Sequence, residues 1–85
     1  MLDRPVLSVR ISDIVREAIP SLAPEISIGP DEALRDIGLT SVGSVNLMLA
    51  LEAAYDLAIP DDELTPANFR SVATIEALVR RLKVA

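Results

Sequence analysis

The chain has 85 residues and a formal net charge of −5, and it contains neither cysteine nor histidine. These features exclude a disulfide framework, a zinc–thiolate site and catalysis by a serine–histidine pair, and they allow one domain with a small core. Hydrophobic residues make up 51% of the chain, aromatic residues only 2%, and glycine is scarce, which favours aliphatic helices over a β-sandwich. We therefore expect a single all-α domain over residues 1–85.

The acidic residues are concentrated in the middle of the chain. Eight carboxylates lie between Asp31 and Glu63, where Arg35 is the one base. Nucleic-acid binding requires a basic surface, so we expect no nucleic-acid partner. The acidic surface would instead attract a basic protein partner, although the same surface could serve only to keep a small protein soluble.

Neither a membrane span nor a signal peptide is predicted. No apolar run approaches the roughly 18 residues that a span requires. Near the N-terminus, Asp3, Arg4 and Pro5 interrupt any apolar segment. We therefore expect a cytoplasmic protein.

The N-terminal part of the chain predicts one helix and then a long connection. Residues 1–5 are expected to fray, and a helix is expected from Leu7 or Ser8 to just before Pro20. Its inward stripe at helical spacing consists of Leu7, Ile11, Ile14, Val15 and Ala18. Residues 20–40 form a connection with a short turn near residues 31–34. We expect it to be held to the core by Leu22, Ile26, Ile28, Leu34, Ile37 and Leu39.

A second helix is predicted over about residues 41–55. Thr40 and Ser41 are both residue types that cap the amino end of a helix, and an apolar run without proline follows them. The Ser41 hydroxyl is thus placed where unpaired backbone N–H groups and the helix dipole favour an attached or bound phosphate. Taken alone, a serine in this position is most often only a cap.

This second helix is apolar on nearly every side. One stripe, which we assign to the core, consists of Ser44, Leu47, Met48, Leu51 and Tyr55. The other consists of Val42, Val45, Leu49, Glu52 and Asp56. A small domain cannot bury both stripes, and apolar residues beside acids are typical of a partner surface. From the spacing alone, a core position for Val45 and Leu49 is equally open.

The last third of the chain predicts a short third helix around residues 61–65, or a loop with one turn there, and then a final helix. The acids at 61–63 suit the first turn of a helix, and they lack the spacing of a calcium loop. Phe69 is expected to anchor the segment that follows, and Ser71 to cap the last helix. Its inward residues are expected to be Ile75, Leu78, Val79 and Leu82.

These elements are specific when they are taken together. The motif Asp36-Ile37-Gly38-Leu39-Thr40-Ser41, an apolar helix through Leu51-Glu52, and then Tyr55-Asp56-Leu57-Ala58-Ile59-Pro60 resemble the acyl carrier protein family over about residues 9–82. The resemblance implies an all-α four-helix bundle with a long first loop and a short third helix. It also implies a 4′-phosphopantetheine arm on Ser41 and enzyme docking on the second helix, at Val42, Val45, Leu49, Glu52 and Asp56.

The function implied by the resemblance is that of a carrier and not of an enzyme. An acyl or aminoacyl group would be held on the arm as a thioester and presented to enzymes of fatty-acid, polyketide or amino-acid-derived biosynthesis. The implied partners are a phosphopantetheinyl transferase, an acyl- or aminoacyl-loading ligase, and a downstream synthase or transferase. We expect a monomer without a bound metal. The alternative is an unmodified helical interaction domain that kept the fold and lost the arm.

The residues around Ser41 depart from the usual family pattern. Carrier proteins commonly have Asp-Ser-Leu where this chain has Thr40-Ser41-Val42. In the family, the aspartate helps to hold the metal ion while the transferase installs the arm, so Thr40 is expected to slow the modification. The variant resembles specialised carriers, including those that synthetase-like ligases load with amino acids.

Overall fold

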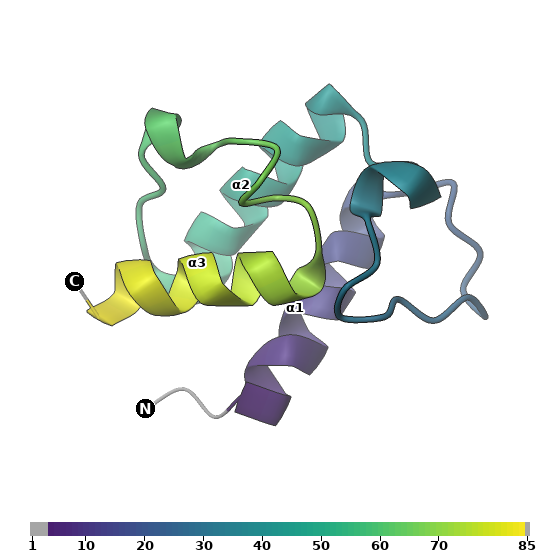
Figure 1. Ribbon diagram of the computed structural model, residues 1–85, viewed down its shortest axis with the longest axis horizontal. Helices are drawn as coiled ribbons and strands as arrows, with labels where there is room; N and C mark the ends of the chain where they lie inside the picture. The colour runs from purple at the N-terminus through teal and green to yellow at the C-terminus, as the bar shows by residue number, and fades with distance from the viewer. Residues whose placement is uncertain (1–3, 85) are drawn as a thin grey trace.

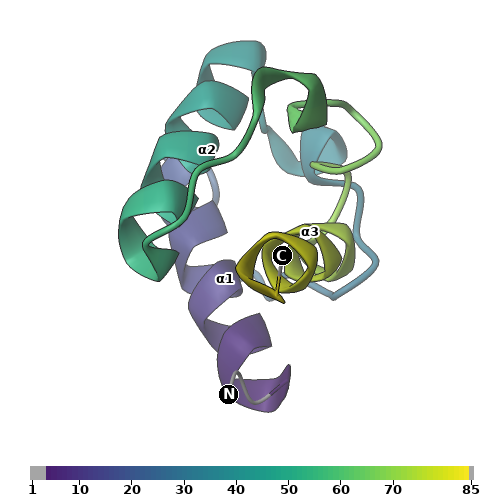
Figure 2. The ribbon, with the colours of Figure 1, turned by 90° about the vertical axis from the view of Figure 1, so that its left-hand side faces the viewer.

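The computed structural model describes the backbone of residues 4–84 and the side chains of residues 9–83. Within this range the chain forms three α-helices, which are α1 (Arg4–Ala18), α2 (Ser41–Tyr55) and α3 (Val72–Val84). Two 3-10 helices, η1 (Leu34–Ile37) and η2 (Asp61–Glu63), lie in the long connections. α1 packs against both α2 and α3, and Figure 2 shows α3 nearly end-on beside α1. The all-α class expected from the composition is confirmed (Figure 1).

The expected count of four helices is not confirmed. For residues 61–65 a short third helix or a loop with one turn was predicted, and the structure has the second of these, the single 3-10 turn η2, which ends at Glu63. Pro66 explains this early end, because a proline disfavours the helical conformation of the residue before it, here Thr65. The Thr65 hydroxyl then accepts a hydrogen bond from the Asn68 backbone N–H at 3.1 Å, which begins a separate turn.

The first helix begins earlier than the sequence predicts. α1 starts at Arg4 and includes Pro5, so the expected fraying is wrong for these two residues, and residues 1–3 lie outside the described range. Proline is tolerated there because the N–H that it lacks would have no acceptor in a first helical turn. The end of the helix at Ala18, before Pro20, is as predicted.

The core is aliphatic, as the composition predicts. The buried hydrophobic side chains are Ile11, Val15, Ile19, Leu34, Leu47, Leu51, Tyr55, Ile59, Phe69, Val72, Ile75, Leu78 and Val79. Ile14, Ala18 and Met48 are half-buried against them. The side chain of Leu7 lies outside the described residues. The core position predicted for Ser44 is wrong, since its side chain is half-buried and lines an open groove at the start of α2. The predicted inward stripes of the three helices are otherwise reproduced, because each helix has one apolar face.

The long first connection is attached to the rest of the fold at several points. The Leu34 N–H donates to the Arg70 carbonyl at 2.8 Å, and the Ala73 N–H donates to the Pro30 carbonyl at 2.8 Å. The Arg16 guanidinium donates to the carbonyls of Ala23 and Ile26. Leu34 is fully buried, as expected for an anchor. The expected core contact of Ile26 is wrong, since its side chain is 46% exposed.

The start of α3 is capped from both sides. The Ser71 hydroxyl accepts from the Thr74 N–H at 3.3 Å, and the Thr74 hydroxyl accepts from the Ser71 N–H at 3.0 Å. This reciprocal arrangement has the logic of a capping box, with threonine in place of the usual glutamate. The predicted cap at Ser71 is therefore confirmed.

No helix in residues 4–84 is both long enough and apolar enough to cross a membrane.

Gly43 allows the amino end of α2 to lie directly on the carboxyl end of α1. A Cβ atom at this position would lie 3.0 Å from the Ala18 carbonyl oxygen and 3.1 Å from the Leu39 side chain. A backbone carbonyl in a packed helix cannot retreat as the end of a flexible side chain can. The approach of α2 to α1 therefore depends on the missing side chain.

We predict that Gly43→Ala lowers the free energy of unfolding by about 1–3 kcal/mol, because the added methyl group overpacks the contact between helices. Each kcal/mol corresponds to a fall in Tm of about 4–8 °C for a domain of this size. The matched control is Gly29→Ala, since nothing lies within 4 Å of a Cβ atom built there. Thermal melts that show equal stability for the two variants would contradict this account.

Candidate functional site

Thr40 caps α2, and Ser41 is the first residue of the helix. Thr40 has an extended backbone, with φ −97° and ψ 173°, and its hydroxyl oxygen accepts from the Gly43 N–H at 3.0 Å. The expected place of Ser41 at the amino end of the helix is confirmed, while its simpler interpretation as the cap is wrong. The exposed Ser41 hydroxyl makes no hydrogen bond within the described residues, so it is available for chemistry.

The surroundings of Ser41 fit an anionic group. The first turn of α2 contains no acidic residue. Thr40 uses the Gly43 and Ser44 N–H groups, through its hydroxyl and its carbonyl, but the N–H groups of Ser41 and Val42 donate to no acceptor in the described part of the chain. Free N–H groups and the positive end of a helix dipole favour a phosphate at this position.

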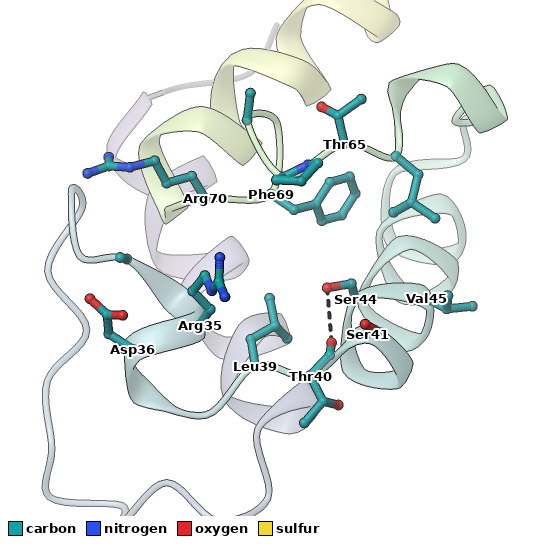
Figure 3. Close-up of a pocket in the computed structure, with 14 residues that line it drawn as sticks. Arg35, Asp36, Leu39, Thr40, Ser41, Ser44, Val45, Thr65, Phe69 and Arg70 are labelled. Carbon is teal, nitrogen blue, oxygen red and sulfur yellow. Dashed lines mark hydrogen bonds between the residues drawn. The ribbon is translucent and has the colours of Figure 1, made fainter.

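An open groove of about 960 Å³ borders Ser41. Its walls come from three segments that are far apart in the sequence, namely residues 33–40, the start of α2, and residues 64–70 (Figure 3). Phe69 closes the groove on the side of the core, where its side chain is 5% exposed. A space of this size accommodates a drug-sized group. The sequence pattern did not predict the groove, because it forms only when the two long connections meet.

The outer face of α2 is apolar and uncovered. The exposed fractions of the Val42, Val45 and Leu49 side chains are 70%, 41% and 53%, whereas Leu47 and Leu51 are fully buried. Val45 and Leu49 are therefore not core residues, which settles the alternative that the spacing left open. The role of these side chains in partner binding remains a prediction.

The two acids on this face also stabilise the end of α2. A Glu52 carboxylate oxygen accepts from the Ile59 N–H at 2.8 Å, and the carboxylate is half-buried. Asp56 ends the helix in the left-handed conformation, with φ 52°, and its N–H donates to the Glu52 carbonyl. The sequence interpretation missed the bond of Glu52, since no local pattern indicates a contact with a residue beyond the end of the helix.

Tyr55 lies at the same end of α2 but is part of the core. Its hydroxyl is buried and has no hydrogen-bond partner among the described residues. Burial raises the pKa of Tyr55, and the charge of Arg10, whose guanidinium lies 5.8 Å from the ring centroid, partly counteracts this effect. An aromatic ring beneath a cation is a stabilising arrangement. Tyr55 is remote from Ser41 and is not assigned to the site.

Comparison of the sequence with known protein families identifies the family of this chain. Residues 9–82 match the family described as "phosphopantetheine attachment site". The chain belongs to this family. The match confirms the predicted resemblance to carrier proteins and the expectation that 4′-phosphopantetheine is the cofactor. The match also agrees with the role of a carrier rather than that of an enzyme. The amino end of α2, which favours a negatively charged group, suits the phosphodiester of this cofactor.

Relatives and solved structures point in the same direction. The chain is 43% identical to aminoacyl carrier protein 2 of Bradyrhizobium diazoefficiens over 70 residues, which cover 82% of this chain and 79% of the relative. It is similar to a chain in the crystal structure of Bradyrhizobium japonicum glycine:[carrier protein] ligase complexed with glycylated carrier protein. The TM-score is 0.74 at 40% identity, covering 86% of this chain and 97% of the other.

A second similar structure is that of the engineered Bradyrhizobium japonicum ligase complexed with the carrier protein from Agrobacterium tumefaciens and ATP. There the TM-score is 0.77 at 31% identity, covering 89% of this chain and 99% of the other. Nearly the whole of each matched chain is thus reproduced in the present fold. The matched chains share the overall fold that presents Ser41 at the start of α2 here.

Proposed function

We propose that this protein carries an aminoacyl group as a thioester on a 4′-phosphopantetheine arm attached to Ser41. The observation that carries the proposal is the free Ser41 hydroxyl, which is exposed at an acid-free helix terminus and beside an open groove. The similarity to aminoacyl carrier proteins supports an amino acid as the cargo. A fatty or polyketide acyl group is the alternative cargo within the same family.

The residues of this chain hold and present the arm. The Thr40 hydroxyl accepts a hydrogen bond from the Gly43 N–H, and this bond holds the backbone just before Ser41. Because Thr40 caps the helix, the Ser41 hydroxyl is left free as the attachment point. The free N–H groups of Ser41 and Val42 stabilise the negative charge of the phosphodiester. The arm supplies the thiol that the cysteine-free chain lacks, while the protein supplies orientation and recognition.

The exposed face of α2 is the surface that we propose for partner docking. Val42, Val45 and Leu49 form its apolar centre, and Asp56 and Glu52 lie at its acidic end. A partner with an apolar patch beside basic residues complements this face. Because the face begins directly after Ser41, a bound partner would hold the root of the arm near its own active site. The crystal structures of ligase–carrier complexes support an aminoacyl-loading ligase as one such partner.

The remaining partners and the location follow from this role. A phosphopantetheinyl transferase would install the arm, and a downstream synthase or transferase would remove the cargo. The expected monomeric state and cytoplasmic location agree with such a shuttle and remain predictions. The alternative function, an unmodified interaction domain, requires that Ser41 receives no arm.

We predict that Ser41 is the sole site of modification. After incubation with coenzyme A and a broad-specificity transferase, intact-mass measurement should show one arm on the unmutated protein and none on Ser41→Ala. Ser44→Ala is the matched control, since its hydroxyl also lines the groove, and it should gain one arm. An arm on Ser41→Ala would refute the assignment, and an unmodified wild type with several transferases would favour the interaction domain.

We predict that Thr40→Asp accelerates installation of the arm. The carboxylate would add a hard-metal ligand at the transferase site, and aspartate is as good a cap as threonine, so α2 should remain intact. Thr40→Ser is the control, because it keeps a capping hydroxyl without adding charge. If Thr40→Asp is modified no faster than Thr40→Ser, the metal-ligand argument does not apply to this protein.

We predict that Leu49→Ala weakens loading and leaves the fold intact, whereas Leu51→Ala destabilises the fold. Loss of an apolar anchor at the docking centre should reduce kcat/KM for loading roughly 5–30-fold, which corresponds to about 1–2 kcal/mol of lost binding free energy. Loss of the buried Leu51 side chain should lower the free energy of unfolding by about 2–5 kcal/mol. Thermal melts and loading kinetics should be measured on both variants. If a well-folded Leu49→Ala protein is loaded as fast as the unmutated protein, the docking face does not include Leu49.

A further inference from the structure

The groove beside Ser41 is lined by two bases, Arg35 and Arg70, and by one acid, Asp36. Arg35, on η1, lines the groove, and Figure 3 shows its guanidinium extending into the space that Ser44 and Leu39 face. This guanidinium makes no ion pair or hydrogen bond within the described residues. It is therefore a charged donor without a protein partner in the described part of the chain, and it lines the same groove as the proposed attachment point.

The backbone that carries Arg35 is held firmly. The preceding residue, Leu34, is fully buried, donates to the Arg70 carbonyl at 2.8 Å, and accepts from the Leu39 N–H at 3.0 Å. The turn closes at Gly38, whose left-handed φ of 113° is accessible to glycine without strain. The backbone that carries Arg35 is thus held to the segment that precedes α3.

The local charges leave Arg35 to act on the arm. Arg35 is the one base between residues 31 and 63, the first turn of α2 contains no acid, and Thr40 is uncharged. The nearest acid in the sequence, Asp36, points away from Ser41 in Figure 3. A phosphodiester on Ser41 would place its charged oxygens three bonds from the Ser41 Cβ, at the mouth of the groove. A guanidinium offers paired donors that match such oxygens.

We propose that Arg35 is a positioning residue that binds the phosphodiester of the arm. The contact directs the arm from Ser41 into the groove between η1 and residues 64–70, which Val45 borders, and away from Val42 and Leu49. The part of the docking face formed by Val42 and Leu49 is then left uncovered for a partner. This inference rests on the proposed attachment at Ser41.

Nuclear magnetic resonance of the arm-bearing protein tests the contact directly. With ¹⁵N-labelled arginine, conversion from the apo to the arm-bearing form should shift the Nε–Hε signal of Arg35. The signal of Arg70, whose side chain lines the groove but extends away from Ser41 in Figure 3, should not shift. With a ¹⁵N-labelled arm, the arm amides should be more mobile in Arg35→Gln than in the unmutated protein or Arg70→Gln. The difference should shrink as salt screens the ion pair.

Two controls separate this proposal from the one on which it rests. Intact mass reports attachment, so a protein without the arm refutes the site and not the role of Arg35. Equal thermal melts of the apo forms show that Arg35→Gln acts on the arm and not on folding. An unmoved Arg35 signal in the fully modified wild type overturns the proposal, even if Arg35→Gln fails to fold. Unchanged arm mobility in a folded Arg35→Gln protein also overturns it.

Discussion

The hydrogen bond from the Gly43 N–H to the Thr40 hydroxyl fixes the point at which α2 begins, and the site depends on that point. Because Thr40 supplies the cap, Ser41 becomes the first helical residue and keeps its hydroxyl free. The same turn is pressed against α1, since Gly43 lies against the Ala18 carbonyl with no room for a side chain. A helix that began one residue later would turn Ser41 into the cap and occupy its hydroxyl.

The two faces of α2 differ in burial, and we propose a docking role for the exposed one. Leu47, Leu51 and Tyr55 hold the helix to the core, while Val42, Val45 and Leu49 face outward. Near the carboxyl end of α2, the half-buried Glu52 carboxylate lies on the outer face and also accepts a hydrogen bond from the Ile59 N–H. Changes at Glu52 would therefore alter the loop after α2 together with the charge of the face. Substitutions at Asp56 report more directly on charge.

The sequence predicted the elements that local physics determines. The apolar periodicity and the Thr40-Ser41 cap were sufficient to place α2 at residues 41–55, and Pro20 was sufficient to end α1. The start of α1 was predicted too late because residues 1–5 were expected to fray, although a first helical turn accepts Pro5. The groove and the bond from Glu52 to Ile59 could not be predicted, since both depend on how distant segments meet. Arg35 was visible as an isolated base, but its neighbours were not.

The two backbone bonds that tie the first connection to the segment before α3 have a dynamic consequence. Leu34 is hydrogen-bonded to Arg70, and Pro30 is hydrogen-bonded to Ala73. We therefore expect η1 and the start of α3 to move together as one body. The start of α2 belongs to another, because it rests on α1 through Gly43. The groove lies at the seam between these bodies (Figure 3). We therefore expect its width to change through a small sliding of packed segments, a shear motion, more than through independent fluctuation of a loop.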